Sequence, residues 1–366
     1  MSLVKSPAFR VFEFEAKLDD TFLDECAKGA IAPLETLNET PLTGWSSPRY
    51  LVDGEINADT CRAGKYVHLF VSTAQRRVPA SLLAVYCRKT ELEMMKEKGV
   101  SSLSRATVRE IRESVRKQML KRMPPSISGL EVAIDTDRSI VYTDAKTDKQ
   151  VDAVSLAFHQ AARSALVPLD PAGAALRRFG VQADSLAPAV FTPEDNGDFV
   201  VNDLGLDFLT WAVWRHDAGK TEFAGEGGKT VAFSVDGPVS LVLEAQGAHH
   251  IALREGAPLA SPEFKSALLA GKKVASLRLG FTIGDDTWSG VVSGSTFTFS
   301  GVKPPATDSN RAEDATFAER MGRLQTWTDT FLSFFGAFLE IRTDEAAWKK
   351  ELSAIRGWLP ALKVRA

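Results

Sequence analysis

The chain has 366 residues, of which 44% are hydrophobic and 25% are charged, a composition typical of a globular protein with buried cores in two domains. No run of 18 apolar residues occurs and the first residues lack a signal-peptide pattern, so we expect a cytoplasmic protein without membrane contact. The three cysteines, Cys26, Cys61 and Cys87, form no CxxC pair. This spacing predicts neither a disulfide framework nor a zinc site, and we expect reduced, mostly buried thiols.

Charge is distributed unevenly along the chain. The formal net charge is −3, yet residues 76–122 contain thirteen Lys or Arg against five Glu and therefore carry +8. The remaining residues must then carry −11. A basic segment on an acidic body confines anion binding to one surface, because like charge repels phosphate elsewhere. The pattern favours nucleic acid as a partner.

Periodicity and capping residues in the first 170 residues predict an α+β region. The expected elements, in chain order, are a strand at 9–15, a helix capped by Asp19 or Asp20, strands near 48–52 and 66–72, a helix from Pro79 to Lys98, a helix from Ser104 to Met123 stopped by Pro124 and Pro125, a hairpin of 130–135 with 139–142, a helix at 148–163 and a strand at 166–169. This order predicts antiparallel sheets backed by helices, rather than a doubly wound parallel sheet.

Residues 171–366 predict a second α/β region. Prolines and glycines between 170 and 200 indicate a connection. The expected elements that follow are a helix from Asp203 or Asp207 to Arg215, a mostly antiparallel sheet at about 229–302 with a helical insert at 262–269, and closing helices at about 312–341 and 345–359. Four phenylalanines crowd the first closing helix, and such wide apolar faces usually pack onto another layer or a subunit. We therefore expect the aromatic helices of this region to help form a dimer interface.

The helix at 104–123 carries two distinct stripes. At about 100° per residue, an apolar stripe that should face a core is formed by Val108, Ile111, Val115 and Met119. A cationic stripe about a quarter turn away, here called the arginine row, is formed by Arg105, Arg109, Arg112 and Arg116. At about 1.5 Å per residue the row spans about 16 Å, and duplex DNA presents one charge per about 1.7 Å of its axis. The row is either a solvated helix face or a contact surface for a polyanion.

No motif in the sequence predicts nucleotide binding. The triplet GlyLysThr occurs at 219–221 and at 228–230. A phosphate-binding loop requires a glycine five positions before the glycine of this triplet, and Trp214 and Phe223 occupy those positions. Neither segment therefore fits the loop.

Four aspartates near the predicted hairpin, Asp135, Asp137, Asp144 and Asp148, could gather Mg²⁺ for phosphodiester cleavage. Hairpin turns favour aspartate for structural reasons as well. The histidines form no HExxH pattern, and the sequence contains neither GxSxG nor a dinucleotide-binding loop. We expect no catalytic residue, metal or cofactor.

Short segments spread along the chain resemble the bacterial RdgC family of recombination-associated proteins. In the first half these are Gly44-Trp45 with Pro48, Val78-Pro79, the hairpin IDTDRSIVYTD at 134–144, and ALVPL at 165–169. In the second half they are AGKKV at 270–274, Leu277 with Leu279, Phe297 with Phe299, and FAER at 317–320. The sequence differs from the shorter members of the family at about 183–247 and around 121–127.

The resemblance implies a ring-shaped homodimer that encircles double-stranded DNA with little sequence preference and restrains the RecA recombinase at the nucleoid. Phosphate contacts supply such affinity without reading bases. The residues that we expect to contact DNA are Arg76, Arg77, Arg88, Lys89, Arg105, Arg109, Arg112, Arg116, Lys117, Lys121, Arg122, Lys272 and Lys273. Two alternatives are a metal-dependent nuclease that uses the hairpin aspartates and a protein-interaction scaffold without DNA affinity.

Overall fold

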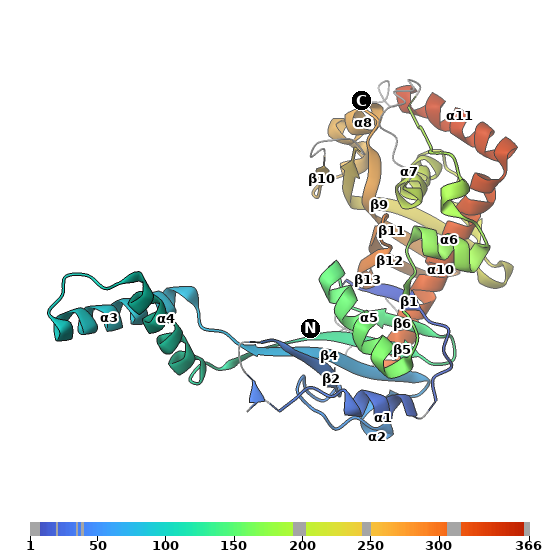
Figure 1. Ribbon diagram of the computed structural model, residues 1–366. Coiled ribbons are helices and arrows are strands. Elements are labelled where there is room, and N and C mark those ends of the chain that lie inside the picture. The colour runs from blue at the N-terminus through green and yellow to red at the C-terminus, as the bar shows by residue number, and fades with distance from the viewer. Residues whose placement is uncertain are drawn as a thin grey trace.

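The computed structural model shows an L-shaped molecule, in which a body built on two antiparallel sheets carries one long projecting arm (Figure 1). The structure describes residues 8–19, 21–33, 36–37, 40–192, 203–243, 250–305 and 316–361. The predicted α+β class with antiparallel sheets is confirmed. Among the described helices, none combines the length and apolar composition that crossing a membrane requires.

The first sheet has the strand order β2-β4-β5-β6-β1-β7, with β3 paired to the inner end of β4. Its strands are β1 (Arg10–Glu13), β2 (Leu42–Ser46), β3 (Arg62–Ala63), β4 (Tyr66–Arg76), β5 (Pro125–Asp135), β6 (Ile140–Thr143) and β7 (Val167–Pro168). Three helices accompany it: α1 (Thr21–Lys28), α2 (Ala58–Cys61) and α5 (Asp148–Ala162). Alternation along β4 and β5 puts Val67, Leu69 and Val132 on the face that packs against α1 and α5.

The second sheet has the order β10-β9-β11-β12-β13, with β8 also paired to β9. Its strands are β8 (Glu222–Ala224), β9 (Thr230–Val242), β10 (Ile251–Leu253), β11 (Lys273–Ile283), β12 (Asp286–Ser293) and β13 (Thr298–Lys303). The helices around it are α6 (Pro171–Phe179), α7 (Leu204–Asp217), α8 (Pro262–Leu269), α10 (Phe317–Thr343) and α11 (Glu345–Ala361). The predicted sheet and its helical insert are both present.

The aromatic residues of α7 and α10 fill the core of the second half. The ring centroid of Phe208 lies 5.1 Å from that of Phe334, 5.2 Å from Phe335 and 5.5 Å from Phe338, in edge-on or tilted contacts. All four rings are fully buried within one chain. Edge-on pairs add about 0.5–1.5 kcal/mol each beyond their buried area. These aromatics are therefore unavailable for the subunit contact that the sequence suggested.

The two sheets meet in one continuous body. Phe9 and Phe299 exchange backbone hydrogen bonds of 2.7 and 2.9 Å, which link the start of β1 to β13. Arg138, in the turn between β5 and β6, donates two hydrogen bonds of 2.8 and 2.7 Å to the carboxylate of Asp329 on α10. The largest hydrophobic core includes residues from both sides of this junction. The division into domains at residue 170 stays a prediction.

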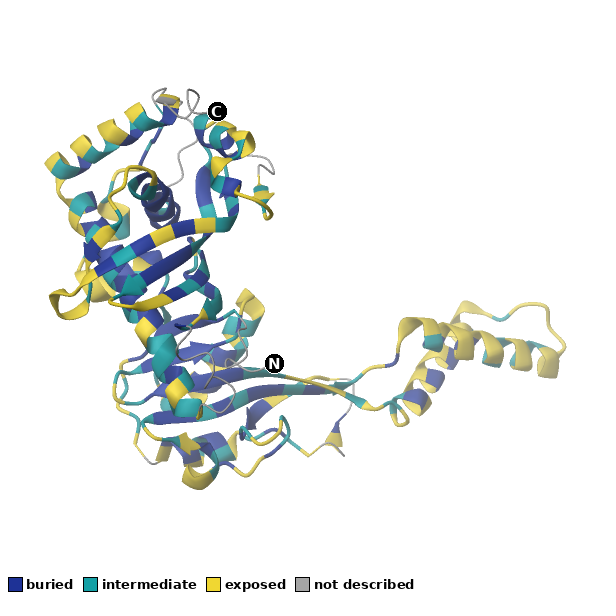
Figure 2. Ribbon diagram, turned by 180° about the vertical axis from the view of Figure 1, so that it is seen from behind, coloured by how far each residue is buried: buried dark blue, intermediate teal, exposed yellow. Residues whose placement is uncertain are grey.

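The arm consists of the outer parts of β4 and β5 together with α3 (Ala80–Lys98) and α4 (Arg105–Leu120), over residues 72–129. The two strands pair without a register shift from Tyr66 with Asp135 to Arg76 with Pro125. At about 3.4 Å per residue, eleven paired positions give a ribbon about 37 Å long. Figure 2 shows the body end of this ribbon buried, whereas at the arm end β4 is buried or half-buried and β5 is exposed at residues 126–128.

Some sequence expectations are wrong. Residues 48–52 form turns, and the edge strand lies earlier, at β2. The expected connection at 170–200 contains α6, which the Asp170 side chain caps by accepting from the Gly173 amide at 2.8 Å. Helix α4 ends at Leu120, before the proline pair. The expected cap Asp20 and the start of the late helix at 312–315 lie outside the described residues, and α10 begins at Phe317.

The three cysteines are buried free thiols, as expected. Burial raises the pKa of Cys26 above the range of an ordinary thiol, because the thiolate would lose its hydration. These thiols are therefore structural in character.

A buried ion pair joins α7 to β11. The ammonium of Lys273 lies 2.7 Å from Asp207 Oδ1, and the two residues are 7% and 0% exposed. Burial raises the pKa of Asp207, and the positive charge of Lys273 counteracts part of that rise. Removing Lys273 leaves the buried carboxylate of Asp207 without its ion-pair partner, and only the more weakly coupled Arg342 still offsets its charge.

We therefore expect Lys273→Met to lower the free energy of unfolding by about 3–5 kcal/mol, which urea denaturation monitored by circular dichroism would measure. Lys303→Met, at an exposed lysine of β13, is the control and should change it by less than about 0.5 kcal/mol. Equal stability of the two variants would contradict a structural role for the pair.

Candidate nucleic-acid interface

The helices α3 and α4 form an antiparallel hairpin at the end of the arm, and local sequence explains its shape. Gly99 ends α3 with φ of 64°, a left-handed conformation that glycine adopts without steric cost. Ser104 then begins α4, because its Oγ accepts a hydrogen bond from the Thr107 amide at 3.1 Å. The predicted boundary at Gly99 is confirmed, and among the three serines that the sequence offered as the cap, Ser101, Ser102 and Ser104, the structure uses Ser104.

The hairpin has a small hydrophobic core of its own. It contains Leu83 and Cys87 from α3 with Ile111, Val115 and Met119 from α4. The predicted inward orientation of the apolar stripe is confirmed at these three α4 positions. Val108, the fourth member of the stripe, is 37% exposed. The core fixes the rotation of α4 about its axis and therefore determines which residues face solvent.

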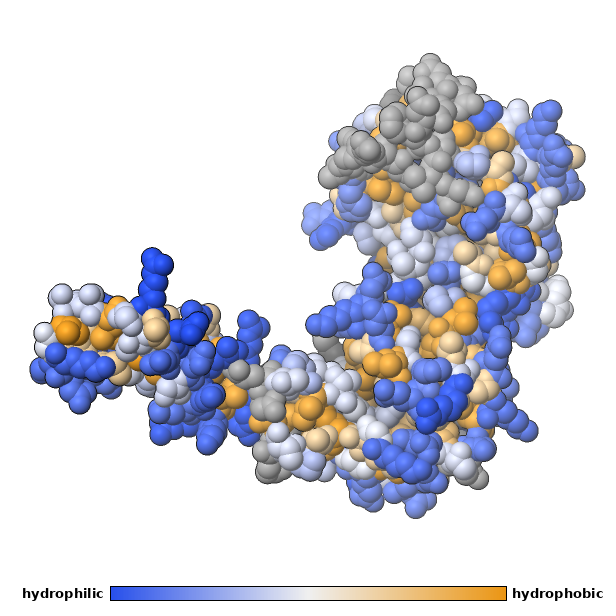
Figure 3. Space-filling view, in the orientation of Figure 1, coloured by the Kyte–Doolittle hydropathy of each residue, from blue (hydrophilic) through white to orange (hydrophobic). Residues whose placement is uncertain are grey.

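All four members of the arginine row are exposed. Within the described part of the chain, no carboxylate lies within ion-pair distance of Arg105, Arg109 or Arg112. Figure 3 shows the hydrophilic surface that gathers over this part of the arm. The helix therefore presents a positively charged row beside the stripe that anchors it.

The other basic residues expected in the arm are placed along both helices and at the ends of the ribbon. Arg88 and Lys89 on α3 pair locally, with Glu91 at 3.2 Å and with Glu93 at 3.9 Å. Arg76 holds the base of the hairpin by donating a hydrogen bond to the Met123 carbonyl at 2.5 Å. The other basic residues expected in the arm are exposed: Arg77, Lys117, Lys121 and Arg122. Their cations add to the charge of the same arm.

The lysine pair expected from the second half lies on the body. Lys272 is half-buried at the entrance to β11. Lys273 is buried and forms the ion pair with Asp207, so its ammonium is shielded from any ligand on the surface. We therefore do not retain Lys273 in the interface.

The hairpin aspartates occupy separate structural roles. Asp135 is fully buried, with Oδ2 2.7 Å from the ammonium of Lys65, and its Oδ1 accepts hydrogen bonds from the amides of Asp137 and Arg138 at 3.2 Å. Asp144 accepts from the Glu131 amide at 2.8 Å, and burial raises its pKa. Across the described ranges, no three His, Cys, Asp or Glu side chains gather as a metal site.

The sequence interpretation missed the apolar residues that the arm exposes. Of the ten large hydrophobic side chains exposed in the described residues, six lie in the arm. Val85 and Leu92 are 65% and 50% exposed, and their spacing of seven puts them on one face of α3, opposite Leu83 and Cys87. The spacing of seven was the available signal, although Arg88 and Lys89 lie between the two residues in the sequence.

Residues 8–177 match the family model described as "Putative exonuclease, RdgC". No curated protein matches the chain. The matched range includes the whole first sheet, the arm and its arginine row, and α6 almost to its end. Over residues 8–177, this chain is similar to the RdgC family.

Proposed function

We propose that this protein binds duplex DNA without sequence preference, through the arginine row of its arm, and does not cleave it. The observation that carries the proposal is the exposed row, three of whose guanidiniums have no carboxylate within ion-pair distance in the described residues. The similarity of residues 8–177 to the RdgC family, together with the resemblance to recombination-associated proteins, supports DNA as the polyanion.

The geometry of α4 favours backbone contact over base reading. The row spans about 16 Å along one side of a helix whose adjacent face is buried against α3. Guanidiniums that bind phosphate oxygens release condensed cations and supply affinity that is independent of sequence. The acidic body repels phosphate and directs the duplex toward the arm.

The proposal includes assembly with a second copy and restraint of recombination. One arm and one body form an open L, so a second chain is needed to enclose a duplex. The exposed apolar side chains Val85 and Leu92 of α3 supply a contact that such a copy would bury. A closed dimer on DNA would obstruct the RecA recombinase, in agreement with the resemblance to recombination-associated proteins.

Replacing the arginine row by glutamine should make the salt dependence of DNA binding shallower. Four lost phosphate contacts change the log–log slope by up to about 3.6, or about 7.2 if both copies of a dimer contribute. Fluorescence anisotropy with duplexes of unrelated sequence, at several salt concentrations, measures the slope. Helix propensity is nearly unchanged, so the variant should fold.

The matched control removes the same charge from the body. It replaces four exposed lysines by glutamine: Lys146, Lys149, Lys349 and Lys350. Its slope should stay within about one unit of the wild-type value. If the arginine variant kept the wild-type slope, or if both variants lost the same amount, the row would be only a solvated face.

The assembly proposal is tested at the arm. Val85→Ser combined with Leu92→Ser removes apolar surface but no charge, and it should shift a dimer toward monomer in sedimentation velocity at micromolar concentration. Leu156→Ser, at a side chain of α5 that is 60% exposed, is the control and should leave the dimer intact. A wild-type monomer, or a dimer indifferent to the arm changes, would refute this contact.

The description of the family model as an exonuclease makes cleavage the second candidate function. We expect a labelled linear duplex to remain intact after incubation with the protein and Mg²⁺ or Mn²⁺. Metal-dependent shortening of the duplex that disappears in Asp135→Asn combined with Asp144→Asn, with folding preserved, would establish the nuclease instead.

A further inference from the structure

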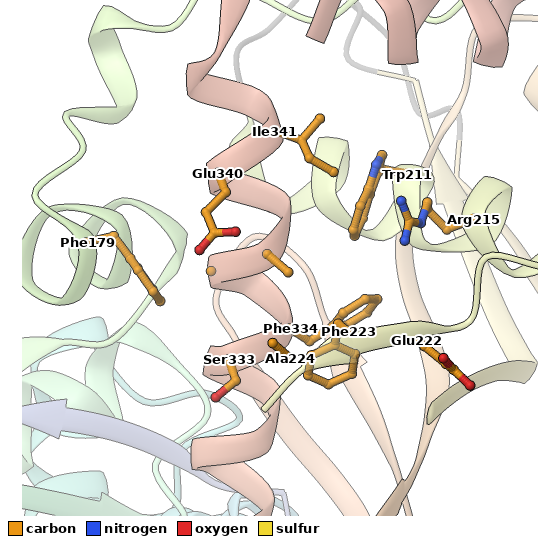
Figure 4. Close-up of a pocket in the computed structure, with 12 residues that line it drawn as sticks. Phe179, Trp211, Arg215, Glu222, Phe223, Ala224, Ser333, Phe334, Glu340 and Ile341 are labelled. Atoms are coloured by element: carbon orange, nitrogen blue, oxygen red, sulfur yellow. The ribbon is translucent and has the colours of Figure 1, made fainter. Parts of the chain in front are cut away.

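A cavity of about 370 Å³ lies beside α10, between α6 on one side and α7 with β8 on the other (Figure 4). All the residues that line it belong to 179–341, outside the family-matched range. It is formed by the body and is separate from the arginine row. No contact described above explains it.

The floor of the cavity is apolar. Gly336 and Ala337 on α10 leave space between Phe179 of α6 and the aromatic pair of Phe223 and Phe334. A Cβ at position 336 would come within 2.5 Å of the Phe179 ring, so the glycine is required for the close approach of Phe179 to α10. Phe179 is itself 39% exposed, and its neighbour Leu176 is 53% exposed, so the apolar surface continues out of the cavity.

Two glutamate side chains lie at opposite edges of this floor. Glu340 lies on the α6 side and Glu222 lies at the opposite edge, on β8 (Figure 4). Both residues are exposed, and neither carboxylate has a cation within ion-pair distance in the part of the chain described. The lining cation Arg215 is already engaged, with Nη1 3.6 Å from Glu351 and its guanidinium 5.3 Å from the Trp211 ring centroid.

We propose that this cavity is a docking site for a partner protein, through a peptide segment that inserts an apolar side chain between flanking lysines or arginines. The apolar floor accepts the inserted side chain, and the two carboxylates attract the cations beside it. Phosphate is disfavoured here because the edges carry the same charge as the ligand. The carboxylates of Glu222 and Glu340 would therefore bind a segment of opposite charge.

A labelled peptide of alternating leucine and lysine pairs is the probe, titrated into the full chain and followed by fluorescence anisotropy. The wild type should bind it, and Glu222→Gln combined with Glu340→Gln should weaken binding at least tenfold. Ala337→Trp, which fills the cavity and keeps both carboxylates, should weaken it by a similar factor. DNA binding by these variants should equal that of wild type, which separates this test from the test of the arm.

Two controls distinguish docking from general attraction to an acidic protein. Glu255→Gln combined with Asp285→Asn removes two exposed charges elsewhere on the second half and should leave peptide affinity unchanged. A peptide with serine in place of leucine should bind at least tenfold more weakly than the leucine peptide. The proposal is overturned if wild type does not bind the leucine peptide, if the serine peptide binds equally well, or if both charge variants lose affinity equally.

Discussion

The antiparallel pairing of β4 with β5 is the constraint on which the rest of the structure depends. Eleven consecutive residues of each strand pair in one register. At the body end the pair forms the middle of the first sheet, where its side chains meet α1 and α5. At the arm end the same pair carries α3 and α4 away from the body. A one-residue slip would turn every side chain of a strand to the opposite face, so the buried end fixes the orientation of the exposed end.

Charge separation follows from this arrangement. The basic residues of the arm are held away from a body that carries most of the carboxylates. In the body, some cations are used for structure, as in the contacts of Arg138 with Asp329 and of Lys273 with Asp207. In the arm, the row on α4 faces solvent. The distribution separates a cationic surface on the arm from an acidic body within one polypeptide.

The helical hairpin was predictable because its determinants are local. Gly99, Ser104 and the three-and-four spacing of Ile111, Val115 and Met119 all act within a few residues. The strand near residues 48–52 was predicted wrongly because a strand needs a partner, and β4 pairs with Leu42–Ser46 instead. Helix α6 was missed although Asp170 and Pro171 at its start and Gly180 at its end are typical boundary residues.

Only the structure could show which charged and aromatic residues are available at the surface. Lys273 has the sequence context of a surface lysine, and its burial depends on Asp207, which belongs to a distant helix. The phenylalanines of α10 were expected at a subunit contact, yet α7 covers them within the same chain. Periodicity identifies an apolar face but does not identify what packs on it. The cavity beside α10 likewise arises from elements far apart in the sequence.

Arginine footprinting tests most directly whether DNA lies along the arm. The protein would be treated with phenylglyoxal, with and without a saturating duplex, and modification of each arginine would be measured by mass spectrometry. We predict that duplex DNA protects Arg105, Arg109, Arg112 and Arg116, while the exposed body residues Arg163 and Arg254 react equally in both samples. Unchanged reactivity of the four row residues, together with protection of arginines on the body, would contradict the account.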